Sequence, residues 1–164
     1  MLSIIESTPQ YLSSIYSMIL ALAKQEGILD KIKINETQLK NLLFCNHPNH
    51  FVAIARMQDE LAGLVFFSFI NHNACFNTSK GIYIEHLYVE PQFRNQGIGQ
   101  ALFTYVANQA EENACSRIEW WVSSQNTSAS RFYKKLGAIA LDEWVIYKCD
   151  KIGISKLIEK QSCD

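Results

Sequence analysis

The sequence predicts an α+β (mixed α/β) fold, a single domain over residues 1–164 built on one central sheet. Two apolar runs, residues 51–57 and 61–70, are separated by a short polar connection, which is typical of a β-hairpin. Apolar residues recur at helical spacing in two long segments, residues 9–25 and 97–113. In the second half, strand patterns alternate with helical ones, which favours a sheet with packed helices.

The first fifty residues predict a short strand and two helices. Residues 2–6 are apolar and suit an edge strand. Thr8-Pro9 begins a helix that runs to about Gln25, because proline is tolerated in a first turn. The apolar face of this helix consists of Leu12, Ile15, Tyr16, Ile19, Leu20 and Ala23. Asn35 begins a second helix, and residues 46–50 are predicted to form a loop.

The remaining segments follow from the same signals. A polar loop is expected at residues 71–80. The further strands are predicted at residues 82–89, 118–122, 138–141 and 144–149, the last two as a terminal hairpin. The further helices are predicted at residues 97–113, 127–136 and 154–160, with Gly137 as the left-handed cap of the second of them.

Charge and hydropathy limit the partners. Fifteen basic residues against sixteen acidic ones leave a formal charge of −1, so neither nucleic acid nor an anionic membrane is expected as a partner. The apolar run at residues 61–70 is about half of the roughly 20 residues that a membrane span needs. The N-terminus lacks the pattern of a signal peptide, so we expect a cytoplasmic protein.

The cysteines predict reduced thiols rather than a metal site. There are five of them, scattered and without a CxxC pair. Cys45 lies near His47 and His50, but the second cysteine group of a zinc site is missing. We therefore assign these three residues to a loop and expect no metal.

One segment between a predicted strand and a predicted helix has the features of an anion site. Residues 92–100 contain Gly97 and Gly99, which let a backbone approach a ligand, and the first N–H groups of a helix suit a pyrophosphate. The Walker loop and the dinucleotide fingerprint are both excluded, since their further lysine or glycine is absent. Taken alone, the segment fits equally well a tight helix entry with Arg94 on the surface.

Three sequence blocks together resemble the GNAT N-acetyltransferase superfamily. They are His86-Leu87-Tyr88-Val89-Glu90-Pro91, Arg94-Asn95-Gln96-Gly97-Ile98-Gly99, and the segment at residues 126–138. A narrower similarity is to the diamine (spermidine/spermine) acetyltransferases. It is carried by Leu22-Ala23-Lys24-Gln25-Glu26, His47-Pro48, Tyr83-Ile84-Glu85, Phe132-Tyr133-Lys134 and Asp150-Lys151. The resemblance implies a mostly antiparallel twisted sheet, splayed at its middle strands, with helices on both faces.

The resemblance further implies acetyl-CoA as co-substrate, in a cleft where the strand at residues 82–89 splays from the one at residues 118–122. Its pyrophosphate would be held by the backbone N–H groups of Arg94, Asn95, Gln96, Gly97, Ile98, Gly99 and Gln100. Its pantetheine arm and thioester carbonyl would meet the main chain of Leu87, Tyr88 and Val89, since negative charge develops on that carbonyl during attack. Asn126 would hold the cofactor or, equally, cap the helix that follows it.

Two side chains are expected to move protons. Tyr133, also beside the cofactor in the family pattern, would be the general acid, since a phenol with a pKa of about 10 suits a leaving thiolate; the alternative is a core aromatic. Glu85 would be the general base, because an alkyl ammonium must lose a proton at a cost of about 4 kcal/mol near neutral pH. Strand alternation predicts that Glu85 shares a face with Leu87 and Val89, opposite His86. The alternative is a carboxylate on a wet rim.

The sequence departs from the diamine acetyltransferases at two places. Those enzymes carry an acidic residue after the glutamate, where this chain has His86, and an acidic residue and a tryptophan where it has Ser123-Ser124-Gln125. Glu26, Glu85 and His86 are the candidate substrate-binding residues. Of Trp120 and Trp121, one should face the core and the other the opposite side or a partner, with packing favoured over a substrate cage.

The predicted function is therefore an acetyl-CoA-dependent N-acetyltransferase for a primary amine of a small molecule: a diamine, a polyamine or a lysine-like amine. Direct attack in a ternary complex is expected, since no cysteine lies in the motif blocks beside a candidate base. A protein or peptide N-acetyltransferase and a non-catalytic acetyl-CoA sensor are the alternatives. The family commonly forms dimers, so the resemblance implies a homodimer.

Overall fold

The computed structural model describes residues 1–71 and 80–161, so the predicted loop at residues 71–80 lies almost wholly outside the described residues. The chain divides into two compact units, residues 1–123 and 124–164, and each is described by itself. The prediction of one domain over residues 1–164 stays a prediction.

The first unit is built on a five-stranded sheet in the order β1-β2-β3-β4-β5. Its strands are β1 (Leu2–Glu6), β2 (His50–Met57), β3 (Glu60–Ile70), β4 (Gly81–Val89) and β5 (Arg117–Trp120). The pairs from β1 to β4 are antiparallel, and β5 alone is parallel to its neighbour. The predicted hairpin is confirmed, with Met57 opposite Glu60 and Gln58 at a φ of 58° in the turn.

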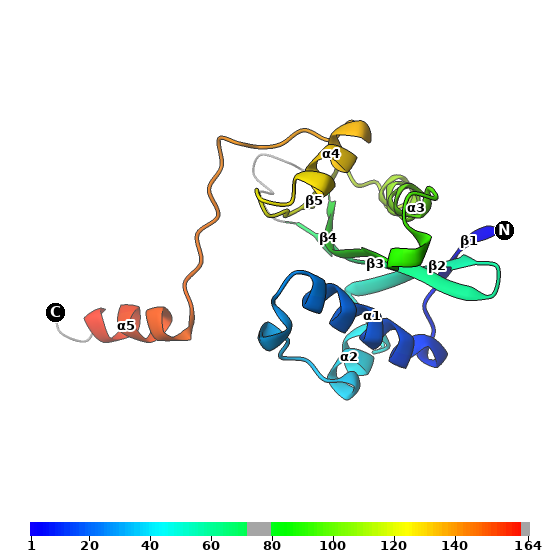
Figure 1. The fold of residues 1–164 in the computed structure, drawn as a ribbon. Coiled ribbons are helices and arrows are strands. Elements are labelled where there is room, and N and C mark those ends of the chain that lie inside the picture. Colours follow the sequence, from blue (N-terminus) through cyan, green and yellow to red (C-terminus); the bar gives the residue numbers. More distant parts are fainter. Residues whose placement is uncertain (72–79, 162–164) are drawn as a thin grey trace. The chain divides into compact units, whose positions relative to one another are not determined.

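Helices cover both faces of this sheet (Figure 1). Helices α1 (Leu12–Gln25) and α2 (Glu36–Leu43) pack on one face, and α3 (Ile98–Glu112) packs on the other. Each helix buries one apolar stripe: that of α3 consists of Ile98, Leu102, Val106 and Ala110. The α+β fold class with helices on both faces is confirmed, and we call the two sides the α1/α2 face and the α3 face.

Local signals account for where the first two helices begin. Pro9 lies in a short 3-10 turn (Pro9–Tyr11) that leads into α1, and Gly27 follows the helix with a φ of 68°. Asn35 caps α2: its side chain accepts from the N–H of Gln38, and the Gln38 side chain accepts from the N–H of Asn35, both at 2.9 Å. This reciprocal capping box satisfies two N–H groups that the helix itself leaves unpaired.

The pairing of β4 with β5 covers only the first half of β4, and the expected splaying of the two strands stays a prediction. Pairing runs from Gly81 opposite Arg117 to Ile84 opposite Trp120 and then stops, because β5 ends at Trp120, two residues before its predicted end. The second half of β4, residues 85–89, therefore has β3 on one side and no β5 partner on the other. An unpaired strand edge of this kind offers backbone N–H and C=O groups to a ligand.

A β-bulge interrupts β4 at Glu85. Phe67 of β3 pairs with Ile84, but the preceding residue Phe66 pairs with His86, so Glu85 is an extra residue without a cross-strand partner on β3. The predicted alternation is therefore wrong for this residue. Ile84 packs with the α3 cluster, as Leu87 and Val89 do. Glu85 instead contacts side chains of the α1/α2 face, the same side as His86.

The second unit contains two helices, α4 (Thr127–Lys135) and α5 (Lys151–Gln161), close to their predicted positions. The predicted strands at residues 138–141 and 144–149 are wrong, since that whole segment is described without a strand. Apolar side chains in it are exposed, Trp144 at 74% and Tyr147 at 92%. The alternating pattern alone did not produce a hairpin, because an isolated two-stranded ribbon is marginal in water.

Among the described helices, none is both long and apolar enough to cross a membrane.

The close approach of Gly63 on β3 to the backbone of β4 leads to a prediction about stability. A Cβ atom on Gly63 would lie 2.4 Å from the carbonyl oxygen of Tyr88 on β4, too close for any real contact. The change Gly63→Ala should therefore push the two strands apart and lower the free energy of unfolding by about 1–3 kcal/mol. Urea denaturation measures this difference. The matched control is Ser3→Ala, on exposed surface of β1, which should change stability by less than about 0.5 kcal/mol; equal effects of the two changes would contradict the packing argument.

Candidate functional site

Glu85 is held by two side chains of neighbouring strands. The Ser68 hydroxyl donates to Glu85 Oε1 at 3.2 Å, and His50 Nε2 lies 3.2 Å from the same oxygen. Ser68 is buried, while the side chains of His50 and Glu85 remain 29% and 30% exposed. Both anchoring residues lie on the α1/α2 face, since the His50 ring packs edge-on against Phe66 of that cluster. The carboxylate is thus fixed in position and still within reach of solvent.

His86 lies beside Glu85 on the same face and has lost part of its basicity. Burial lowers the pKa of its imidazole below the usual value, and the charges of Glu85 and Glu26 oppose this shift without cancelling it. Its ring packs 5.8 Å from the ring of Phe66. At neutral pH His86 is therefore an uncharged imidazole, which does not repel a cationic ligand.

Two aromatic residues extend this side of the site. Tyr83 lies two residues before Glu85, and burial together with the Glu85 charge raises the pKa of its phenol. Its ring meets Trp121 edge-on at 5.6 Å, and Trp121 is 68% exposed. Trp120 instead packs 4.9 Å from Phe103 in the α3 cluster. The predicted division of the two tryptophans is confirmed, and Trp121 offers a face that suits a cationic amine.

The segment between β4 and α3 has the geometry of an anion-binding helix entry. Asn95 and Gly97 have positive φ values, 59° and 79°, and α3 begins at Ile98. Gly97 is the N-cap and carries no side chain that could accept from the first N–H groups of the helix. A Cβ on Gly97 would meet nothing within 4 Å, so packing does not require a glycine here. The left-handed backbone conformation of Gly97 favours glycine, and a ligand close to the backbone would favour it too.

Arg94 ties this segment to the rest of the unit. Its Nε donates to the carbonyl of Val89 at 2.9 Å, and its Nη2 donates to Gln25 Oε1 on α1 at 2.5 Å. The guanidinium therefore fixes the turn against the end of β4 and the end of α1. Of the predicted cofactor-binding residues, Arg94 to Gln100 are exposed or partly exposed except Ile98, whose side chain is buried in the α3 cluster.

The main chain of Leu87, Tyr88 and Val89 lies in the part of β4 that β5 does not pair with. Their side chains point into the two cores: Leu87 and Val89 pack with α3, and Tyr88 with α1 and α2. The Tyr88 hydroxyl donates to Glu90 Oε2 at 3.1 Å. The backbone groups of this segment that β5 does not pair with are placed to meet a ligand, and their role toward the cofactor stays a prediction.

The end of α1 contributes the predicted substrate residue Glu26. It is exposed at the C-cap of α1, and its charge raises the pKa of His86 against the effect of burial. Its neighbour Gln25 receives the hydrogen bond of Arg94. The last residues of one helix thus meet both the turn before α3 and the His86 side of the site.

Asn126 and Tyr133 belong to the second unit. The Asn126 side chain accepts from the N–H of Ala129 at 3.1 Å, so the N-cap interpretation is confirmed, and a role toward the cofactor stays a prediction. Tyr133 lies on α4 with its ring 5.3 Å from that of Phe132. Its role as general acid also stays a prediction.

Sequence reasoning missed His50, Ser68 and Gln25. His50 was assigned to a loop, but it is the first residue of β2, paired directly with Ser68 across the β2–β3 ladder. The alternation of His50 with Val52 and Ile54 could have placed it on the α1/α2 face. The hydrogen bond of Gln25 joins residues far apart in the chain and had no local signal.

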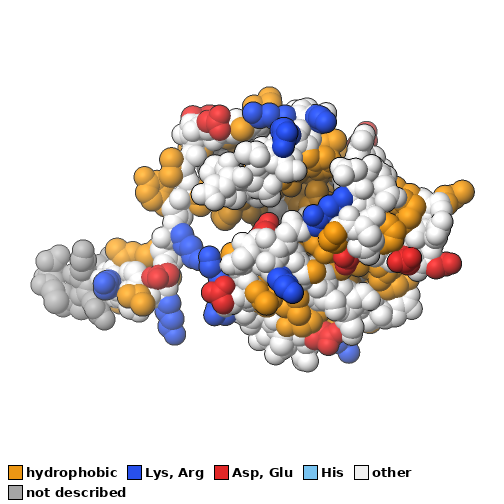
Figure 2. All heavy atoms as spheres, in the orientation of Figure 1, with side chains coloured by type: hydrophobic (Ala, Val, Ile, Leu, Met, Phe, Trp, Pro, Cys, Tyr) orange, Lys and Arg blue, Asp and Glu red, His pale blue; other side chains and the backbone are white. Residues whose placement is uncertain are grey.

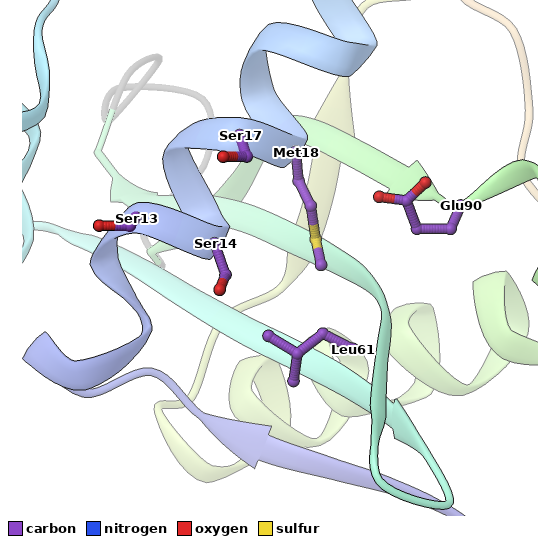
Figure 3. A pocket seen from close by; sticks show the side chains of 6 residues that line it. All are labelled: Ser13, Ser14, Ser17, Met18, Leu61 and Glu90. Carbon is purple, nitrogen blue, oxygen red and sulfur yellow. The ribbon is translucent and has the colours of Figure 1, made fainter.

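Three further features of the described part of the chain bear on the search for another site. Among the described residues, no group of three or more His, Cys, Asp or Glu side chains could hold a metal. Figure 2 shows Lys and Arg interspersed with Asp and Glu on the visible face, without a continuous basic patch. A hollow of about 390 Å³ beside α1 is lined by Ser13, Ser14, Ser17, Met18, Leu61 and Glu90 (Figure 3), none of them a predicted site residue.

Comparisons with known proteins bear on this site. The family model described as Acetyltransferase (GNAT) family matches residues 18–138. Thialysine N-epsilon-acetyltransferase of Bos taurus is 32% identical over 148 residues, which cover 83% of this chain and 83% of the relative. L-ornithine N5-acetyltransferase of Arabidopsis thaliana is 38% identical over 84 residues, 51% of this chain and 36% of that protein. An integron cassette protein from the V. cholerae mobile metagenome has a TM-score of 0.77 and 25% identity, covering 96% of this chain and 98% of its own.

The lowered pKa of His86 predicts how the free energy of unfolding depends on pH. Because the folded protein binds this proton less readily than the unfolded chain does, stability that is present above a pH of about 6.5 should be lost as the pH falls below it. The free energy of unfolding should thus fall from pH 7 to pH 5 by more in the native protein than in His86→Gln. Urea titrations at both pH values measure this, with exposed His47→Gln as control. Equal pH dependence of the native protein and His86→Gln would contradict it.

Proposed function

The chain belongs to the Acetyltransferase (GNAT) family, and from this premise we propose that it transfers an acetyl group from acetyl-CoA to a primary amine of a small molecule. The observation that carries this proposal is the juxtaposition at the end of β4. A partly exposed, anchored carboxylate, an unpaired strand edge and a glycine-containing helix entry follow one another within residues 85–99. Each suits a different part of the reaction: the amine, the acyl-bearing arm and the pyrophosphate.

The first unit fits acetyl-CoA by its backbone rather than by its charges. The N–H groups at the start of α3 have no side-chain acceptor from the N-cap, and the helix dipole adds a partial positive charge there. The open space around Gly97 leaves room for a phosphate close to the backbone. On the edge of β4, backbone groups of residues 87–89 would pair with the pantetheine arm.

We propose that the amine substrate is amino-acid-like, in the class of ornithine or thialysine, rather than a polyamine. Two curated relatives carry these substrates in their names. His86 supports this choice. An acidic residue at this position would attract the second ammonium group of a polyamine, whereas the buried His86 imidazole is uncharged and does not. Glu26 and Glu85 together with the ring of Trp121 still favour a single cationic amine.

Direct attack within a ternary complex is the mechanism we propose. Glu85 takes the proton of the bound ammonium, directly or through water. The amine nitrogen then forms the new C–N bond with the acetyl carbon, the C–S bond breaks, and Tyr133 gives its proton to the leaving thiolate. The second proton, which the nitrogen loses as it becomes an amide, returns to the Tyr133 phenolate directly or through water. The accessibility of the Glu85 carboxylate supports the first step.

By resemblance to the family we also propose that the protein works as a homodimer. A cytoplasmic location is proposed with it, since the cysteines carry no pattern of a disulfide framework.

The substrate proposal is tested by steady-state CoA release with a panel of amines. Ornithine and thialysine should raise the rate well above acetyl-CoA hydrolysis. Their kcat/KM should exceed that of spermidine by roughly five- to tenfold. With His86 in place of an acidic residue, the second ammonium group of spermidine loses about 1 kcal/mol of electrostatic attraction. A peptide with a free amino terminus serves as the comparison. Activity confined to the peptide would favour a peptide N-acetyltransferase, and tight cofactor binding without any turnover would favour a sensor.

The proposed general acid is tested by Tyr133→Phe. This change should lower kcat by roughly 10²- to 10⁴-fold, because the thiolate leaves without a proton donor, while acetyl-CoA affinity changes little. Calorimetry with acetyl-CoA and single-turnover rates separate these two quantities. Tyr147→Phe is the matched control, since Tyr147 lies in the same unit and is 92% exposed. An unchanged kcat in Tyr133→Phe would remove this residue from the reaction.

A further inference from the structure

We propose that His50 is a positioning residue for Glu85: its imidazole, together with the Ser68 hydroxyl, holds one carboxylate oxygen so that the other faces the amine. The inference rests on the proposed function, in which Glu85 is the general base. It extends that function to two residues on β2 and β3 that no sequence motif marks.

The need for positioning follows from the bulge. Glu85 is the extra residue between Ile84 and His86, so its backbone lacks the cross-strand pair that fixes an ordinary strand residue. A glutamate side chain has several rotatable bonds, and burial or packing does not fix this one, since 30% of it is exposed. The orientation of the carboxylate therefore depends on the side chains that contact it.

His50 and Ser68 are placed to act together. They are direct partners in the antiparallel register of β2 and β3, and their side chains project from the same face of the sheet. Both contacts end on the same oxygen, Oε1, each at 3.2 Å. Among the contacts made by described residues, none ends on Oε2. Two donors on one oxygen thus leave the second oxygen as the proton acceptor.

The His50 ring is itself held in place. It meets Phe66 edge-on, with ring centroids 5.8 Å apart and planes at 67°. The same Phe66 ring lies 5.8 Å from His86, so one buried aromatic separates the two imidazoles. Of these two histidines, only His50 contacts the Glu85 oxygen. The two therefore have different functions: His86 affects the local charge, and His50 sets the position of the carboxylate.

His50 neither gains nor loses a proton over the proposed reaction. One ammonium proton moves to Glu85 Oε2, the C–N bond forms as the C–S bond breaks, and the thiolate receives the Tyr133 proton. The nitrogen loses a second proton as the amide forms, and this proton restores the Tyr133 phenol directly or through water. His50 Nε2–H donates to Oε1 before and after these steps. Other titratable groups around the carboxylate are Tyr83 and His86 on β4 and, toward His86, Glu26 at the end of α1.

The test compares His50→Phe with His50→Gln in the full-length protein, using an amine that the native protein acetylates. His50→Phe keeps an aromatic ring against Phe66 but removes the donor, and kcat should fall by up to about 100-fold with little change in the KM for acetyl-CoA. His50→Gln supplies an amide N–H, which should restore most of kcat.

Three controls make the outcomes distinct. His47→Gln, at an exposed histidine of the preceding loop, should match the native protein. Thermal denaturation verifies that His50→Phe is folded at the assay temperature. Glu85→Gln reports on the base itself: if it keeps full activity, the proposed role of Glu85 fails. If Glu85→Gln is inactive but His50→Phe retains kcat, or if His50→Gln is as slow as His50→Phe, the positioning role of His50 alone is overturned.

Discussion

The candidate site depends on one irregularity in the sheet, the extra residue at Glu85. In a regular strand, residues 85 and 86 would project from opposite faces. The bulge places both on the α1/α2 face, while Ile84 and Leu87 on either side remain in the α3 core. The carboxylate and the imidazole are therefore adjacent in space because they are adjacent in the chain. A single register shift thus turns a core strand into a strand that also carries polar groups at its surface.

The bulge also explains why polar residues are tolerated in this part of the sheet. An extra residue leaves a ladder position unsatisfied and the strand locally bent. Ser68 would be an isolated buried hydroxyl on β3, but it donates to Glu85. Among the described residues, no buried side-chain nitrogen or oxygen lacks a partner. The polar cluster is thus self-consistent: each group satisfies the hydrogen bonding of another, at the point where the sheet departs from regularity.

The sequence predicted those features that depend on neighbours in the chain. The start of α2 at Asn35, the β2–β3 hairpin and the start of α3 at Gly97 all depend on residues within a few positions of one another. It failed where the outcome depends on distant partners. Alternation assumed a regular β4, and only the pairing with Phe66 and Phe67 reveals the bulge. The segment at residues 144–149 has strand-like composition, but strands form by pairing with a partner, which composition does not supply.

The candidate site likewise has parts that depend on chain neighbours and parts that depend on distant residues. The glycine-containing turn before α3 could be predicted because its geometry depends on local residues, the glycines and the helix that follows; its binding of an anion stays a proposal. The surroundings of Glu85 could not, because His50 and Ser68 reach it through strand register, and Gln25 reaches Arg94 from a different element. Gln25 contacts the turn and Glu26 acts on His86, and they are consecutive residues at the end of α1. Because one helix end meets both places, a displacement of α1 would alter the turn and the charge beside Glu85 together.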